Sequence, residues 1–301
     1  MKSRCLFFLI IGLCSLKTAQ AEDPARYCLK SDPFTPKTGD EMEKTISIST
    51  SMSITNLIEN RSVTNLTASL KLKFTEKVLA WDVTNDSARV DLVVKQFFVS
   101  NQHLAKELVE PGTRVTGTYI LGVWFFKPFS GSLSQDAENL LSKIYVHPEY
   151  EVKDFGYLKF DQPRAVGESW NIESIPHIAD ALNEMGNSVG YSARKLLEQI
   201  NTNNMTATAR FMGLTNIAGF DCYDLRMRAN ISNKTTRFEY SGKIDGDLVM
   251  PLDTSQTFWT KNASVEIMMS LMDMENGTNM VHFRGKTSVE FAETCRGMPQ
   301  S

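Results

Sequence analysis

Serine and lysine occur together in two places where their spacing would suit nucleophilic acyl transfer. Ser192 and Lys195 match S-x-x-K, in which the lysine lies one helical turn from the serine and can accept its proton. Lys286-Thr-Ser288 follows later, but the Ser/Tyr-x-Asn element of such enzymes is missing from the intervening chain. Ser192 also suits the start of a helix. The match is therefore interpreted as chance.

The sequence contains no convincing motif for binding a metal or a phosphate group. The four histidines occur in neither HExxH nor HxH spacing. The acidic residues around Asp245-Gly-Asp247 and Asp273-Met-Glu275 lie near glycine turns, but a calcium loop needs more oxygen ligands at stricter spacing. GxGxxG and Walker A sequences are also missing. The sequence therefore predicts no cofactor and no metal, and it indicates no catalytic residues.

The first 21 residues carry the clearest functional signal of the chain. Lys2 and Arg4 precede an apolar run at residues 6–13, and Ala19-Gln20-Ala21 has the small-x-small pattern that a signal peptidase recognises. The apolar run is too short to span a bilayer. The sequence predicts a secreted or periplasmic protein that is cleaved after Ala21. A lipoprotein anchor at Cys14 is disfavoured because Leu13, rather than a small residue, precedes it.

Cleavage makes the chain more acidic. It removes Lys2, Arg4 and Lys17 from 32 basic residues, which leaves 29 against 35 acidic residues and a net charge of −6. An acidic surface argues against nucleic acid and against unaided adsorption to an anionic membrane.

Three cysteines remain after cleavage, namely Cys28, Cys222 and Cys295. An odd number favours one bridge and one free thiol in an oxidising compartment. The termini of compact domains often lie close together, so the expected pair is Cys28 with Cys295. The alternative is three reduced or buried thiols.

Methionines crowd the last third of the chain, and an aromatic cluster lies near residue 125. Thioether side chains adapt to varied apolar shapes, so a curved sheet that is incompletely covered by helices could hold an apolar cavity. The candidate lining residues are Trp124, Phe125, Phe126, Met268, Met269 and Met272. The alternative is an ordinary core in which methionine fills gaps.

Alternating residues predict strands at both ends of the chain. The apolar residues of segments 46–54 and 66–74 recur with period two, and a turn near Asn60 makes the two segments a hairpin. Further strands are expected at residues 89–99, 113–126, 220–231, 235–250, 255–271 and 279–293. Asp245-Gly246 and Asn276-Gly277 are expected turns.

Helical periodicity is confined to the middle of the chain. A helix is expected from Ser132 or Ser134 to a point before Pro148, and a second helical zone at residues 176–200. The order of strands, helices and strands predicts an α+β fold: a large curved antiparallel sheet, half-barrel-like, with a few helices on one face. Residues 22–301 are expected to form a single domain, or two packed β-rich halves that meet near residues 130–200.

Val166-Gly167-Glu168-Ser169-Trp170 resembles a V-G-[DE]-S-W element of uncharacterised bacterial secreted proteins, where it divides two β-rich halves. The general layout is similar to periplasmic lipoprotein carriers, whose half-barrel sheet wraps helices around an acyl-binding cavity. This likeness is architectural and implies no functional residue. From the residues alone, Gly167 lets the backbone turn and Trp170 anchors the core.

Three functions agree with these observations. The first is an exported, non-enzymatic binding protein for a lipid or other apolar small molecule, or for an envelope or extracellular protein. The second is a secreted hydrolase whose site is assembled from dispersed residues. The third is an extracellular structural or interaction glycoprotein, because Asn-x-Ser/Thr occurs eight times. A Ser- and Thr-rich β-protein would also generate such sequences by accident.

Overall fold

The structure is a computed structural model that describes residues 25–28, 37–82, 87–120, 123–145, 163–172, 206–234, 238–253, 256–275 and 279–298. The described strands are β1 (Arg26–Tyr27), β2 (Glu41–Asn56), β3 (Arg61–Asp82), β4 (Ser87–Asn101), β5 (Ala105–Glu107), β6 (Arg114–Ile120), β7 (Val123–Pro128), β8 (Arg164–Ala165), β9 (Ser169–Asn171), β10 (Thr206–Ile217), β11 (Phe220–Lys234), β12 (Phe238–Pro251), β13 (Phe258–Glu275) and β14 (Asn279–Gly297). One helix, α1 (Gln135–Ile144), lies within the same ranges.

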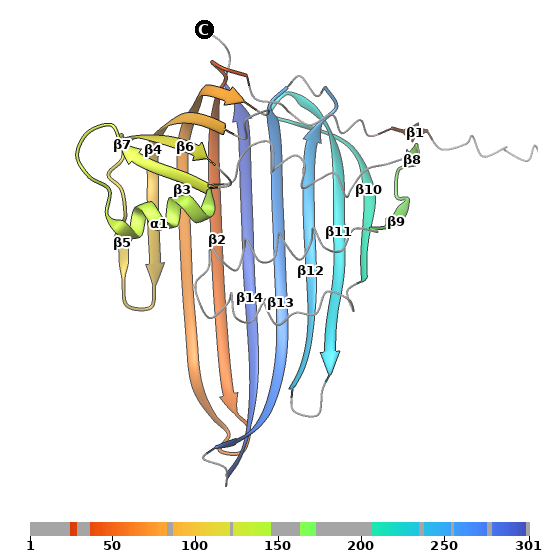
Figure 1. Ribbon diagram of the computed structural model, residues 1–301. Helices are drawn as coiled ribbons and strands as arrows, with labels where there is room; N and C mark the ends of the chain where they lie inside the picture. The colour runs from red at the N-terminus through yellow and green to blue at the C-terminus, as the bar shows by residue number, and fades with distance from the viewer. Residues whose placement is uncertain are drawn as a thin grey trace, which may run out of the picture.

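A single antiparallel sheet of twelve strands dominates the molecule (Figure 1). Its strand order is β7-β6-β4-β3-β2-β14-β13-β12-β11-β10-β9, and β5 pairs with β4 beside this path. The sheet is open, because β7 and β9 end the order without pairing to each other. β1 and β8 form a separate two-stranded ribbon.

The first and last long strands meet at the centre of this sheet. Ile48 of β2 lies opposite Phe291 of β14, and the pairing runs from Met42–Gly297 to Asn56–Phe283. The amino-terminal strands therefore extend to one side of this junction and the carboxy-terminal strands to the other.

The predicted first hairpin is present. β2 and β3 pair with Ile48 opposite Leu70, and the chain reverses through residues 57–60. Asn60 takes a φ of 51° in this turn, a left-handed conformation that asparagine tolerates better than most residues.

The two faces of the sheet differ sharply in polarity. On β2, Ile46 and Ile48 are buried, whereas Ser49, Ser51 and Ser53 point the other way and are exposed. We call the face of Ile46 and Ile48 the inner face and the face of these serines the outer face. This alternation follows from the period of two along a strand, which sends neighbouring side chains to opposite faces.

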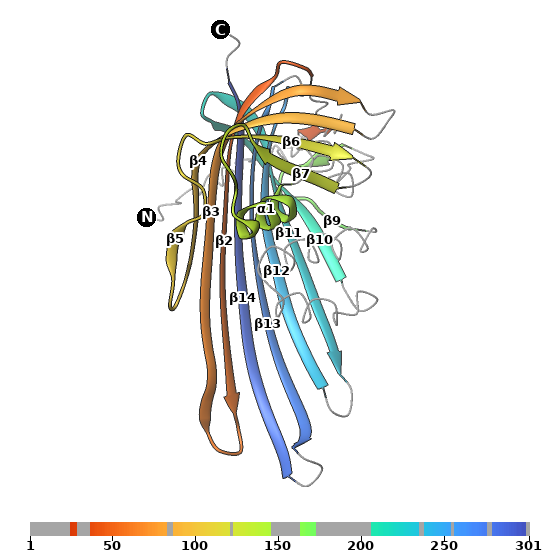
Figure 2. The ribbon, with the colours of Figure 1, turned by 60° about the vertical axis from the view of Figure 1, so that its left-hand side comes forward.

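The helix α1 packs on β7 at one end of the sheet. Ser134 caps it by accepting a hydrogen bond from the Ala137 backbone N–H at 3.2 Å. Figure 2 shows the sheet bending toward the side where α1 lies. The large antiparallel sheet is thus confirmed, and one helix accompanies it in the described residues. The predicted helical zone at residues 176–200 lies outside them.

The predicted turn at Asp245-Gly246 is wrong, because both residues lie inside β12. Asp245 is paired with Arg228 of β11 and its carboxylate accepts a hydrogen bond from Arg228 Nε at 2.9 Å. At Gly246 a side chain would meet Met227, whose Cε lies 3.5 Å from the position of a Cβ. A cross-strand ion pair and close packing therefore override the local turn preference. The expected turn at Asn276-Gly277 lies outside the described residues.

The expected bridge between Cys28 and Cys295 is not formed, and all three cysteines are free thiols. Cys295 is buried in β14, with its Sγ 3.7 Å from Sδ of Met42. Cys28 is exposed, and its carbonyl oxygen accepts a hydrogen bond from the Tyr223 hydroxyl of β11. Two strands, β12 and β13, separate β11 from β14, so the hydrogen bond to Tyr223 holds Cys28 away from Cys295.

Candidate functional site

The aromatic residues of β7 form part of a filled core. Trp124 and Phe126 are 5% and 1% exposed, and both rings pack against Tyr145, at centroid distances of 4.6 and 5.4 Å. Phe74 of β3 completes the group at 5.9 Å from Tyr145. Phe125 points to the other face and is 50% exposed. Trp124 and Phe126 therefore fill the space under β7 with Tyr145, and Phe125 lies apart from them.

The candidate methionines of β13 lie on different faces of the sheet. Met268 is exposed on the outer face, whereas Met269 is half-buried on the inner face. Met272 pairs with His282 through the backbone, and its side chain lies outside the described residues. Five strands stand between β7 and β13 in the sheet, so the six predicted cavity residues are not gathered into one site.

The inner face remains apolar beyond the buried core. Leu66 of β3 lies opposite Met52 of β2, and the next inner-face position on β2 is Ile54. Leu66 is 48% exposed, and Met52, Ile54 and Met269 are half-buried. We call these four side chains the open end. Figure 1 shows β2, β3, β13 and β14 continuing well past α1 toward this end.

Glycine shapes the inner surface of the open end. Gly285 of β14 is paired with both Ile54 and Met269. A Cβ at Gly285 would lie 2.9 Å from Cγ of Met269, so the methionine side chain lies across the space that a larger residue would fill. The apolar surface is therefore continuous from β2 to β13, and its most adaptable member is a thioether.

The opposite end of the inner face contains a buried ion pair. Lys44 Nζ of β2 lies 3.6 Å from Glu76 Oε2 of β3, and their side chains are 1% and 0% exposed. The Lys44 ammonium also lies 5.4 Å from the ring centroid of Tyr145 and 5.6 Å from that of Trp259. The Glu76 oxygens have no hydrogen-bond donor in the described part of the chain. The attraction of Lys44 is thus the main compensation for burying this carboxylate.

A second buried carboxylate with a lysine partner lies beside this pair. Glu293 of β14 is 3% exposed, and it accepts a hydrogen bond from Trp259 Nε1 at 3.3 Å. Lys261 Nζ lies 3.4 Å from its other carboxylate oxygen. The sequence carries a signal for these groups, because Lys44, Glu76 and Glu293 occupy positions where the period of the strand calls for an apolar residue.

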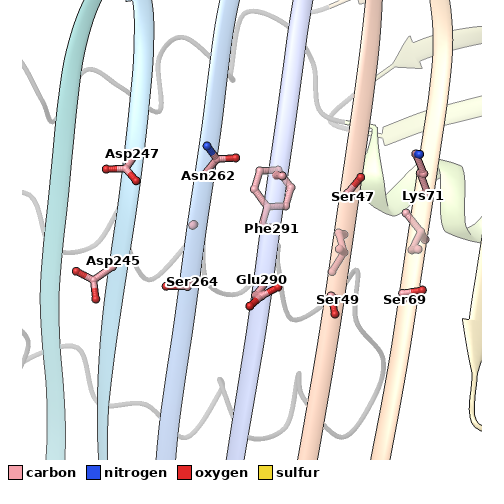
Figure 3. Close-up of a pocket in the computed structure, with 14 residues that line it drawn as sticks. Ser47, Ser49, Ser69, Lys71, Asp245, Asp247, Asn262, Ser264, Glu290 and Phe291 are labelled. Carbon is pink, nitrogen blue, oxygen red and sulfur yellow. The ribbon is translucent and has the colours of Figure 1, made fainter.

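A shallow groove crosses the outer face of β3, β2, β14, β13 and β12 (Figure 3). Its volume is about 510 Å³. Its lining residues with polar side chains are Ser47, Ser49, Ser69, Lys71, Asp245, Asp247, Asn262, Ser264 and Glu290. None of the predicted cavity residues lines it.

The acidic side of this groove is neutralised by neighbouring arginines. Arg226 Nε donates to Asp247 at 2.8 Å, and this hydrogen bond raises the pKa of Arg226. Asp245 is bound by Arg228 in the same way. Burial raises the pKa of the nearby Asp224 carboxyl, and the charge of Asp247 adds to the effect. The charges of Asp245 and Asp247 are therefore balanced locally, and the described residues contain no metal-binding group of histidine, cysteine and acidic side chains.

Ser270 and His282 form a contact that the sequence did not reveal. Ser270 Oγ of β13 lies 2.7 Å from His282 Nε2 of β14, which is within hydrogen-bond distance. A nucleophile and its base need this distance, but they also need a third group that orients the base. Among the hydrogen bonds of the described residues, none reaches the other ring nitrogen of His282. The contact is a cross-strand hydrogen bond on the polar face.

The Val166–Trp170 element folds against the edge of the sheet. Gly167 has a φ of 85°, and its N–H donates to the Phe211 carbonyl of β10 at 2.7 Å. The Glu168 carboxylate accepts from the Ala165 N–H and from Arg164, and these bonds lower the pKa of Glu168. Trp170 is half-buried and packs against the main core. The element thus forms the turn between β8 and β9 and is fastened to β10.

Comparison with known proteins yields only distant likenesses. No protein family matches the chain, and no curated protein matches it. A lipovitellin structure that describes lipid–protein interactions shares 8% identity at a TM-score of 0.28, and the match covers 89% of this chain. The chain spans only 26% of that lipovitellin chain.

Two bacterial outer-membrane proteins are also similar at this level. The protease OmpT from Escherichia coli shares 12% identity at a TM-score of 0.19, covering 89% of this chain and 100% of OmpT. The protein OprG from Pseudomonas aeruginosa shares 8% at a TM-score of 0.14, covering 89% and 99%. Likenesses at TM-scores this low carry no assignment of fold or function. In the described ranges, no helix is long and apolar enough to cross a membrane.

Proposed function

We propose that this chain is an exported, non-enzymatic binding protein that holds an apolar ligand, such as an acyl chain, against the inner face of its sheet. The observation that carries the proposal is the open end, where apolar side chains continue the inner face but are not fully buried. The sheet bends toward the inner side, so a half-barrel-like concave surface would border the ligand (Figure 2).

The energetics of the open end favour an apolar occupant. Fully burying one side chain the size of leucine or methionine contributes about 1.5–3 kcal/mol. The four side chains of the open end are only partly buried, so each would gain part of this free energy when a ligand covers it. Met52 and Met269 have flexible unbranched side chains that fit acyl chains of different shape.

The outer groove differs from the open end of the inner face because it contains charged side chains. Asp245 and Asp247 are paired with arginines, and serines, alanines, Asn262, Lys71 and Glu290 also line the groove. An apolar molecule that covered these charged side chains would have to remove them from water, which costs free energy. The polar outer face therefore suits contact with water, and the inner face is the side on which an apolar ligand gains free energy.

Titration with a fluorescent fatty acid, cis-parinaric acid, tests the proposal. Substitution Ile54→Asp places a charge on the inner face at the open end and is expected to weaken binding at least about tenfold. Ser53→Asp adds the same charge one residue away on the outer face and is the matched control, expected to bind like the unaltered protein.

Leu66→Asp provides a second test at a position that is 48% exposed, where the fold tolerates a charge more easily. Circular dichroism confirms that each variant is folded. If the unaltered protein takes up no fatty acid, or if all three variants bind it equally well, the proposed site is wrong.

A further inference from the structure

A hairpin at the other end of the sheet exposes an apolar tip. Ile120 of β6 lies opposite Val123 of β7, and Phe125 follows on the same face of β7. These side chains are 49%, 50% and 50% exposed. We call them the tip patch. The alternate residues Tyr119 and Trp124 are buried on the other face, so packing among the described residues does not account for the apolar character of the exposed side.

Basic residues stand behind the tip patch along the same face. Lys127 is two residues beyond Phe125, a distance of about 7 Å along a strand. Arg114 lies further back, with its guanidinium 5.2 Å from the ring centroid of Phe129, which is 73% exposed. The hairpin thus changes from apolar at its tip to cationic at its base. Interfacial helices bury their apolar face to a similar depth, about 5–10 Å, at the boundary between headgroups and acyl chains.

The two cations differ in their availability. Arg114 is paired with Asp91 of β4 at 3.3 Å. Lys127 has no acidic partner among the described residues, and its side chain is exposed. Lys127 is therefore the residue whose charge an anionic lipid headgroup would complement. Because the whole chain is acidic, apolar contact by the tip patch must supply most of the attraction.

We propose that the β6–β7 hairpin is a membrane-contact element that inserts Ile120, Val123 and Phe125 into the surface of a lipid bilayer while Lys127 meets anionic headgroups. Pairing with a second copy through β7 is disfavoured, because this edge strand ends in Lys127 and Pro128, and proline lacks the N–H that a ladder needs. Figure 2 shows β6 and β7 leaning away from the long strands.

Flotation with vesicles tests this proposal on the chain from residue 22. The vesicles are made of phosphatidylcholine alone, or of phosphatidylcholine and phosphatidylglycerol in equal parts. Phe125→Asp and Ile120→Asp are each expected to weaken association at least about tenfold with both kinds of vesicle. Met268→Asp is the matched control, because Met268 is a similarly exposed apolar residue far along the sheet.

Lys127→Gln separates the charge from the apolar contact. It is expected to weaken association about fivefold with the anionic vesicles only. Equal binding by the tip variants and the unaltered chain, or an equal loss in Met268→Asp, would overturn the proposal. A dimer that dissociates in Phe125→Asp would also overturn it, since a second copy would then occupy the patch. Fatty-acid uptake without vesicles is measured in parallel, so failure of the two proposals can be told apart.

Discussion

The single residues with the most demanding environment are Lys44 and Glu76. Both are charged, both are almost fully buried, and aromatic rings rather than water surround the ammonium group. Burying two charges costs several kcal/mol each, and their mutual attraction offsets this cost only while both are present. The pair joins β2 to β3 beside the ring of Tyr145.

Removing one partner of this pair should be much worse than removing both. Lys44→Met leaves the Glu76 carboxylate buried without compensation, and we expect a loss of about 3–5 kcal/mol in the free energy of unfolding. The double variant Lys44→Met, Glu76→Leu should recover most of that loss. Urea unfolding measures both, and a double variant as unstable as the single one would show that the pair does not act as a unit.

Glu43 should make stability depend on pH. Hydrogen bonds from Lys95 and Lys73 lower the pKa of Glu43 in the folded state. An acid whose folded pKa is lowered contributes stability above its unfolded pKa, and this contribution is lost as the pH falls through the folded value. The side chain is 36% exposed, so solvent screening limits the effect to roughly 0.2–1 kcal/mol.

The variant Glu43→Gln therefore should lose less stability than the unaltered protein between about pH 7 and about pH 3. Urea unfolding at the two pH values measures the difference. Glu266→Gln, which removes the acid of an exposed pair with Lys286, is the comparison. An identical pH dependence in Glu43→Gln and the unaltered protein would contradict the assignment.

At the scale of elements, α1 depends on one cap. Ser134 accepts a hydrogen bond from the Ala137 N–H, and the acidic Asp136 and Glu138 occupy the first turn. Ser134→Ala should destabilise the protein by about 1 kcal/mol, and Ser132→Ala, which removes the other candidate cap, should cost less. Thermal unfolding measures the stability of the two variants. An equal loss of stability in both would show that Ser134 is not the cap of α1.

The alternation of residues along the strands could be predicted from the sequence, but contacts that depend on the neighbouring strand could not. Alternation in residues 46–54 located β2 and correctly divided its two faces. Asp245-Gly246 was misinterpreted because turn preference is local, whereas the ion pair to Arg228 and the packing of Met227 are made by another strand. The Ser270–His282 contact was missed for the same reason: it needs the register of β13 and β14.

At the scale of the whole molecule, distant pairing decides the architecture. β2 and β14 lie side by side although Ser51 and Ser288, whose hydroxyls are 2.7 Å apart, are separated by 237 residues. No local pattern predicts that junction, and the proximity of chain ends suggested instead a bridge between Cys28 and Cys295. The apolar residues were recognised one by one, yet Trp124, Met268 and Met269 were assigned to one cavity because their order across the sheet was unknown.

The central claim is that the inner face holds an apolar ligand. Native mass spectrometry of the exported protein, before and after incubation with palmitic acid, tests it most directly. We expect a mature chain that begins after Ala21 and carries the mass of one bound lipid or, after incubation, of one palmitate. A chain that retains only its own mass under both conditions would contradict it.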